Sequence, residues 1–178
     1  MKFLVLSLIL GLSLIAGELT LQSGSVMGLT GVVGDRNIDP KNEQLSAALS
    51  MESNDILTLK GTIDVKMAMF KSSNADRDEH MYEALEIEDF ANSRYTIKSV
   101  EAIDTPDHYT LKGELELHGV KKPLDFKAKI TIDGKTVTIE ATSKINVEDY
   151  DIEMPCLLGF TMCVDENVAI NGVAVLSK

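Results

Sequence analysis

Hydrophobic and polar residues alternate along most of this chain, and the alternation is clearest between Tyr109 and Val147. Successive side chains of a β-strand point to opposite faces, so a period of two predicts strands with one apolar and one solvated face. The apolar positions form three groups: Tyr109, Leu111, Leu115 and Leu117; Leu124, Phe126, Ala128, Ile130 and Ile132; Val137, Ile139, Ala141, Ile145 and Val147. Strands of this kind must enclose an interior.

The same period extends to other parts of the chain. Residues 56–70 form the longest predicted strand, in which Gly61 marks a kink or bulge. Its apolar face carries Leu57, Leu59, Ile63, Val65, Met67 and Met69. Further strands are predicted over residues 18–30, 44–50, 93–103, 108–118, 124–132, 137–147 and 168–176. Gly119 and Pro123 bracket the connection before the strand at 124–132.

One segment departs from the period of two. Ser73 or Asn74 can cap a helix whose first turn carries Asp76 and Asp78, which suit the positive end of the helix dipole. Met81, Ala84 and Leu85 follow at helical spacing. The predicted fold class is therefore all-β with one inserted helix, in which about eight antiparallel strands close into a barrel. Side chains can fill the interior of such a barrel or leave room for a guest.

The beginning of the chain is typical of a secretory signal. Lys2 precedes an apolar stretch over residues 3–15, and Ala16-Gly17 supply the small side chains of a cleavage site. The stretch is shorter than the roughly 20 residues that span a bilayer, and no later segment is long and apolar enough to do so. We expect residues 1–17 to be a signal peptide and residues 18–178 to form a single domain without an integral membrane span.

The charge of the chain excludes some partners. Lys and Arg number 17 against 28 Asp and Glu, a formal net charge of −11, and no basic cluster is longer than Lys121-Lys122. Such a chain repels phosphate backbones and anionic lipid surfaces. Nucleic acid is therefore not an expected partner.

The two cysteines, Cys156 and Cys163, bracket a loop, and in an oxidising compartment this spacing predicts a disulfide that pins it. A metal site is not expected, because His80, His108 and His118 are scattered. The loop carries four apolar residues, Leu157, Leu158, Phe160 and Met162. They either complete the core at one barrel end or form a lid or docking surface at its mouth.

Two motifs resemble those of a known family. Residues 75–81 read Ala-Asp-Arg-Asp-Glu-His-Met, Phe90 follows, and residues 112–124 read Lys-Gly-Glu-Leu-Glu-Leu-His-Gly-Val-Lys-Lys-Pro-Leu. They are similar, in order and spacing, to the helix motif and the strand-turn-strand motif of the YceI-like family of bacterial periplasmic lipid-binding proteins. The resemblance covers roughly residues 57–176. It implies a periplasmic, extended, lipocalin-like antiparallel barrel that holds an amphiphile in its lumen.

Within such a barrel, the inward residues of the alternating strands are the candidate lumen lining. They are Leu57, Leu59, Ile63, Val65, Met67, Met69, Tyr109, Leu111, Leu115, Phe126, Ile130 and Ile139. His80 and Tyr82 are candidate mouth residues that offer hydrogen-bond donors to a head group. Arg77 and Asp78 form a candidate structural motif, in which Arg77 pairs with a carboxylate and Asp78 caps the helix, although direct contact with a ligand is the alternative.

The predicted function is non-catalytic binding, sequestration or transport of a long-chain amphiphile: a polyisoprenoid, an isoprenoid quinone or a fatty-acid derivative. No cofactor is expected besides this ligand. One alternative is a packed barrel that acts as a protein-interaction or stress-related module, and association of two barrels through edge strands is left open. Another is a hydrolase that uses His80 with Asp78, or His108 with Asp104 and Asp107, but no nucleophile motif such as G-x-S-x-G accompanies these residues.

Overall fold

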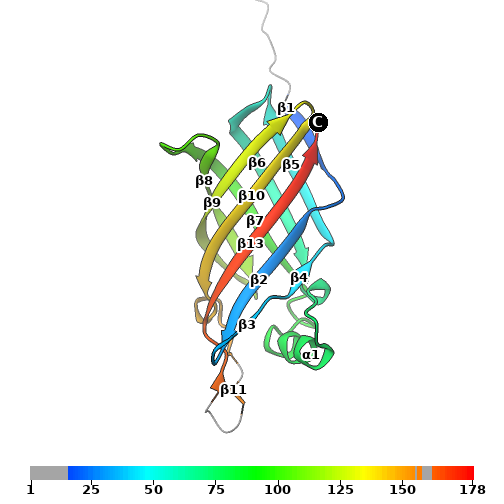
Figure 1. Ribbon diagram of the computed structural model, residues 1–178, viewed down its shortest axis with the longest axis vertical. Helices are drawn as coiled ribbons and strands as arrows, with labels where there is room; N and C mark the ends of the chain where they lie inside the picture. Colours follow the sequence, from blue (N-terminus) through cyan, green and yellow to red (C-terminus); the bar gives the residue numbers. More distant parts are fainter. Residues whose placement is uncertain (1–15, 155, 158–161) are drawn as a thin grey trace, which may run out of the picture.

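Eight antiparallel strands close into a barrel in the computed structural model, which describes residues 16–154, 156–157 and 162–178 (Figure 1). The strands are β1 (Ala16–Leu21), β2 (Val26–Val33), β3 (Arg36–Ile38), β4 (Lys41–Asn42), β5 (Leu45–Glu52), β6 (Asp55–Lys66), β7 (Asn92–Ala102), β8 (His108–Leu117), β9 (Val120–Asp133), β10 (Thr136–Asn146), β11 (Cys156–Leu157), β12 (Met162–Cys163) and β13 (Asn167–Ser177). The helices are α1 (Ala75–Ala84) and the 3₁₀ turns η1 (Met67–Met69) and η2 (Val147–Tyr150).

Neighbouring strands pair in the order β1-β5-β6-β7-β8-β9-β10-β13, and β13 pairs with β1 to close the ring. β13 is shared between two partners, because residues 169–173 pair with β2 and residues 176–177 pair with β1. The expected strand over residues 18–30 is therefore two strands. The chain turns at Ser25, whose hydroxyl bonds to the backbone of Gln22 and Val175, and Gly24 takes a left-handed conformation with φ +90°.

The inserted helix lies where the sequence predicts it. Asn74 caps α1 by accepting a hydrogen bond from the Arg77 backbone N–H at 2.9 Å. In Figure 1 the helix lies at one end of the barrel, the same end as β11, and the C-terminus lies at the opposite end. The fold class expected from the sequence, an all-β barrel with one helix, is confirmed.

Two connections differ from the sequence prediction. The strand expected over residues 56–70 ends at Lys66, and Met67 and Met69 belong to η1, because the chain leaves the barrel wall there to reach α1. Gly119 and Pro123 do not bracket a loop. His118 and Gly119 both adopt left-handed backbone conformations and make a two-residue turn, so Pro123 already lies within β9.

The kink predicted at Gly61 is present. Gly61 has φ +129°, and a Cβ at this position would collide with the carbonyl oxygen of Ala48 on β5. Glycine is therefore required where β6 passes close to its neighbour.

Candidate functional site

Side chains fill the barrel lumen at the end opposite α1. The largest fully buried side chains there are Leu49, Leu59, Ile130, Val137 and Leu176, each less than 2% exposed. Ile97, Leu111 and Ile139 are also buried and belong to the same apolar core. Close packing of this half leaves no room for a guest.

The half of the lumen next to α1 is hollow. It contains a cavity of about 830 Å³, within the range of about 300–1,000 Å³ that is usual for small-molecule sites. Apolar side chains of the barrel wall surround it: Met27, Leu29, Ile63, Val65, Tyr95, Leu115, Leu117, Phe126, Ile145, Val168 and Ile170. The lumen is therefore packed at one end and open to a guest at the other.

The boundary between the two halves can be followed from strand to strand. Ile63 pairs with Tyr95 and Tyr95 pairs with Leu115, so these three lining residues on β6, β7 and β8 share a register row. The inward residues farther from α1 on the same strands are buried and do not line the cavity: Leu59, Ile97 and Leu111. The same division holds on β9, β10 and β13, where Phe126, Ile145 and Ile170 line the cavity but Ile130, Ile139 and Ala174 do not.

Two aromatic rings form the floor of the cavity. The rings of Tyr95 and Phe126 contact each other edge to face, with centroids 4.7 Å apart. The Tyr95 hydroxyl lies 3.0 Å from the carbonyl oxygens of both Leu111 and Leu124 and donates to one of them at a time. Burial, aided by the negative charge of Asp125, raises the pKa of Tyr95 far above its usual value, so this phenol stays neutral.

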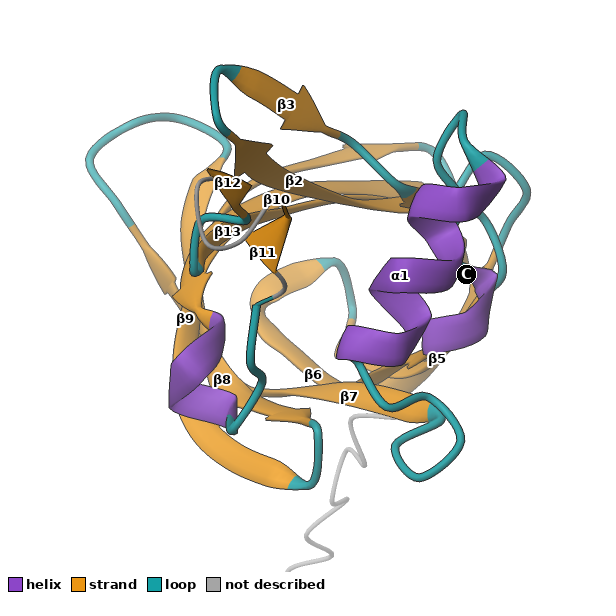
Figure 2. Ribbon diagram, turned by 90° about the horizontal axis from the view of Figure 1, so that it is seen from below, coloured by secondary structure: helices purple, strands orange, loops and turns teal. Residues whose placement is uncertain are grey.

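Three segments surround the mouth of the cavity. The helix α1 contributes Arg77, His80, Met81 and Ala84; the β2–β3 hairpin contributes Val33, Asp35, Arg36, Asn37 and Ile38; and the chain around the β11–β12 hairpin contributes Glu153, Met154 and Val164. Figure 2 shows α1, β3 and β11 at this end of the barrel. The mouth therefore combines apolar and charged side chains, as a site for an amphiphile requires.

Charges of both signs lie at the mouth. Arg36 and Arg77 are two of the three arginines of the chain, and neither forms an ion pair with another described residue. The third, Arg94, pairs with Asp64 at 2.5 Å. Four exposed carboxylates line the same mouth: Asp35, Asp76, Glu83 and Glu153. Acidic groups therefore outnumber the guanidinium groups.

Residues 16–176 match the YceI-like domain. The chain belongs to the YceI-like family. A UPF0312 protein of Pseudomonas putida strain F1 is 30% identical over 124 residues, which are 64% of this chain and 62% of that protein's length. The match thus spans less than two thirds of this relative.

Solved structures show the same YceI-like fold. Burkholderia cenocepacia BcnA superposes with a TM-score of 0.72 at 12% identity, over 84% of this chain and 95% of BcnA. A polyisoprenoid binding domain from Saccharophagus degradans, implicated in plant cell wall breakdown, gives a TM-score of 0.66 at 11% identity, over 89% of this chain and 97% of that domain. At these identities the likeness concerns the fold.

Of the twelve residues predicted to line the lumen of this YceI-like barrel, five line the cavity: Ile63, Val65, Met67, Leu115 and Phe126. Four lie in the packed half: Leu59, Leu111, Ile130 and Ile139. Met69 and Tyr109 are partly buried and do not line the cavity.

The prediction for Leu57 is wrong, since this side chain is 52% exposed. Leu57 lies near the tip of the β5–β6 hairpin, beyond the last residue of β6 that pairs with β7. Sequence reasoning also missed lining residues on β2. Met27, Leu29, Gly31 and Val33 recur at a period of two, and this signal predicts an inward face.

The two predicted mouth residues have different surroundings. His80 is exposed and lines the cavity, whereas Tyr82 does not. The Tyr82 hydroxyl lies 2.5 Å from the Phe70 carbonyl oxygen and 3.1 Å from that of Ala68, so it ties α1 to the chain that follows β6. Residues two apart on a helix point in different directions, which is why His80 and Tyr82 do not share the mouth.

The structural motif at Arg77 and Asp78 is only partly as expected. Asp78 is buried and accepts a hydrogen bond from the Ser72 backbone N–H at 2.7 Å, so it supports the start of the helix from inside, while Asn74 is the cap. The expected pairing of Arg77 with a carboxylate is wrong for the described residues. Its guanidinium group is available at the mouth.

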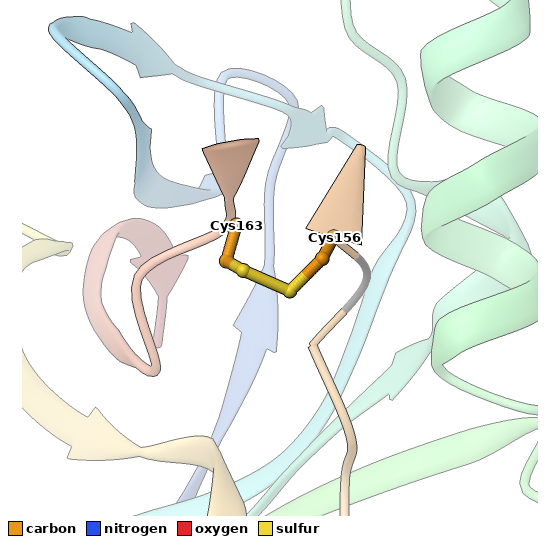
Figure 3. Close-up of a disulfide and its surroundings, with 2 residues drawn as sticks. All are labelled: Cys156 and Cys163. Carbon is orange, nitrogen blue, oxygen red and sulfur yellow. A yellow bond between two sulfur atoms is a disulfide. The ribbon is translucent and has the colours of Figure 1, made fainter. Parts of the chain in front are cut away.

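The predicted disulfide is confirmed. Cys156 and Cys163 pair across β11 and β12 and join through their sulfur atoms near the mouth (Figure 3). Whether the loop forms a lid or completes the core depends on four apolar residues. These residues, or their side chains, lie outside the described part of the chain: Leu157, Leu158, Phe160 and Met162. The expected signal peptide also lies almost wholly outside it, and β1 begins at Ala16.

The remaining histidines have structural partners. His118 lies between the Tyr150 carbonyl oxygen, 3.1 Å from Nδ1, and the Glu86 carboxylate, 3.2 Å from Nε2. His108 lies 2.7 Å from the Pro106 carbonyl oxygen within its own turn. Among the described residues, no group of three or more His, Cys, Asp or Glu is placed to hold a metal ion. No helix of the described chain has the length and apolar character to cross a bilayer.

Proposed function

We propose that this YceI-like protein binds the apolar part of an amphiphile in the hollow half of its barrel and sequesters or transports it without covalent chemistry. The observation that carries the proposal is the cavity of about 830 Å³, whose wall within the barrel is almost entirely apolar. The guest is a polyisoprenoid, an isoprenoid quinone or a fatty-acid derivative. Its polar head lies at the mouth among the charged residues.

Burial of hydrocarbon supplies enough free energy for this role. Each methylene removed from water contributes about 0.8 kcal/mol, so ten methylenes gain about 8 kcal/mol before the costs of ordering and association are subtracted. The side chains that would contact the tail include Val65, Met67 and Leu115. Met67 is unbranched and polarizable, which suits a guest with a mobile chain.

The comparisons support the class of guest. The Saccharophagus degradans domain is described as polyisoprenoid binding, and it shares the fold over 89% of this chain. The shared fold supports a related apolar guest here.

The proposed place of action is the periplasm. The Cys156–Cys163 disulfide fits an oxidising compartment, and we propose that the signal peptide is removed near Gly17, which leaves residues 18–178 as one lipid-binding domain. The intact mass of protein from a periplasmic extract tests this directly. A chain that retains residues 1–17 in the cytoplasm contradicts it.

The binding proposal is tested by organic extraction of protein purified from its native compartment, followed by lipid mass spectrometry. We expect about one amphiphile per chain. Met67→Trp should fill part of the cavity and lower this amount severalfold, because Met67 is buried and lines it. Leu57→Trp is the matched control, since Leu57 is exposed near the tip of the β5–β6 hairpin and the same substitution there leaves the cavity unchanged. An empty extract from the wild-type protein, or equal retention in both variants, contradicts the proposal.

A further inference from the structure

The floor of the cavity lies in the middle of the barrel and is made by two nearly inaccessible rings. Tyr95 and Phe126 are each 6% exposed, and they reach the lumen from β7 and β9, which are separated by β8. Their edge-to-face contact therefore spans three neighbouring strands. Beyond the floor, the packed half of the lumen begins.

The floor is held in place. The Tyr95 hydroxyl is bound by carbonyl groups of Leu111 on β8 and Leu124 on β9, so the ring is fixed at its far end as well as at its backbone. Gly113 on β8 makes room for the ring, because a Cβ there would lie 2.5 Å from Tyr95 Cζ. A side chain with both ends fixed does not swing away to admit a longer ligand.

The distance from the floor to the mouth is short. On β6 the lining runs from Ile63, which pairs with Tyr95, towards Met67 of η1, and on β2 it runs from Met27 to Val33, six residues or about 20 Å at about 3.3 Å per residue. An extended alkyl chain advances about 1.3 Å per carbon, given bonds of about 1.5 Å, so about fifteen carbons span the longer of these walls. The volume of about 830 Å³ makes the cavity wide for its depth.

We propose that Tyr95 and Phe126 form a stop that sets the depth to which a tail enters this barrel, so that the protein selects short or compact apolar tails over long extended ones. The inference rests on the proposed binding function and adds a limit to it. A tail longer than the cavity gains no affinity from its additional carbons, because these carbons stay at the mouth in contact with water.

The wall just beyond Phe126 gives the stop a simple test. Ala128, Ala141 and Gly172 form one register row on β9, β10 and β13, and all three side chains are small. Ala128 is the inward residue that follows Phe126 on its own strand. Removing the Phe126 ring therefore deepens the cavity toward these small residues, which lie between Tyr109 of β8 and Met27 of β2 in the same row.

The experiment measures the affinities of straight-chain primary alcohols of eight to twenty carbons by displacement of a fluorescent fatty alcohol. For the wild-type protein, affinity rises about fourfold per methylene and then stops rising at a break near fifteen carbons. Phe126→Ala should move the break to longer chains by two or more carbons. Leu115→Phe, which raises the floor at the level of Tyr95, should move it to shorter chains.

Leu176→Ala is the matched control. It truncates a fully buried side chain in the packed half, away from the stop, so it lowers stability but leaves the break in place. Thermal unfolding establishes that each variant is folded. If Phe126→Ala does not fold, Phe126→Leu is used in its place.

The outcomes separate the two proposals. The stop is supported if the chain length at the break changes in Phe126→Ala and Leu115→Phe but not in Leu176→Ala. Alcohols that bind with no break up to twenty carbons, or with the same break in every variant, overturn the stop and leave the binding function standing. Absence of binding by every alcohol in every variant overturns the binding function, and the stop with it.

Discussion

The ring of Tyr95 occupies the space that a side chain at residue 113 would need. A Cβ built on Gly113 would lie 2.5 Å from both Cζ and Oη of Tyr95 and would collide with the Thr96 carbonyl oxygen. The glycine and the tyrosine lie on adjacent strands, close to the point where the β7–β8 register shifts between Ile97 and Ser99. This pair is the structural basis of the cavity floor.

Gly113→Ala should therefore destabilise the protein. The added methyl group must displace the Tyr95 ring or the backbone at Thr96, and overpacking of this kind costs about 1–3 kcal/mol of unfolding free energy. Urea denaturation measures the loss. Gly172→Ala is the control, because a Cβ there meets only the Val26 carbonyl oxygen at 3.9 Å. Equal stability of the two variants would contradict this account of the floor.

Tyr95 also predicts a loss of stability at alkaline pH. Burial raises its pKa in the folded protein, so the unfolded chain loses the phenol proton first, near pH 10. The contribution of the Tyr95 phenol to the free energy of unfolding is complete below pH 10. It declines as the pH rises above 10, by up to about 1.4 kcal/mol per pH unit. Unfolding free energies between pH 8 and pH 11 measure the slope.

Tyr95→Phe is the comparison that isolates this effect, because Tyr150 also has a raised pKa through burial and the nearby Asp149. The variant lacks the hydrogen bond to Leu111 or Leu124, so it should be less stable than the wild type at pH 8 by about 1–2 kcal/mol. The difference between the two proteins should narrow as pH rises past 10. A constant difference up to pH 11 would show that Tyr95 ionises as readily in the folded protein as in the unfolded chain.

The Cys156–Cys163 disulfide should stabilise the protein through its unfolded state. Closing a loop of this length removes about 2–3 kcal/mol of chain entropy, so replacing both cysteines with serine should lower the unfolding free energy by about that amount. Intact mass after alkylation provides the chemical check. We expect no adduct under denaturing conditions until a reductant is added, and two adducts afterwards. A thiol that reacts without reductant would refute the bridge.

The charges at the mouth predict a preference among head groups. Four exposed carboxylates against Arg36 and Arg77, on a chain of net charge −11, repel an anionic head. At an ionic strength near 0.01 M, decanol should bind about threefold or more tightly than decanoate, and the difference should shrink at 0.5 M salt as screening grows. Arg77→Gln should widen the difference and Glu153→Gln should narrow it. Tighter binding of decanoate at low salt would show that the arginines dominate the mouth.

Local patterns predicted much of the architecture. The period of two placed Leu111, Leu115, Phe126, Ile130 and Ile139 on inward faces, and all five are buried in the barrel. The cap at Asn74 and the spacing of the cysteines likewise depend on residues close together in the chain. These features are predictable because strand faces, helix caps and short loop closures are set by neighbours along the sequence.

The depth of the lumen could not be predicted in this way. Phe126 and Ile130 share one face of β9, yet Phe126 lines the cavity and Ile130 is packed among other side chains. Which of the two meets open space depends on the Tyr95 ring from β7, and that ring depends on Gly113 of β8 and on carbonyl groups of β8 and β9.

The sequence by itself determined which faces of the strands are apolar, where the helix interrupts them and which cysteines pair, because each of these follows from chemistry a few residues apart. Only the tertiary structure decided that half of the barrel lumen is packed and half is hollow, and that Leu57 is exposed. It also decided that Tyr82 bonds α1 to the chain after β6 and does not line the mouth. The physical reason is that a cavity is the volume left over when side chains from many strands meet, and that remainder has no pattern along any single strand.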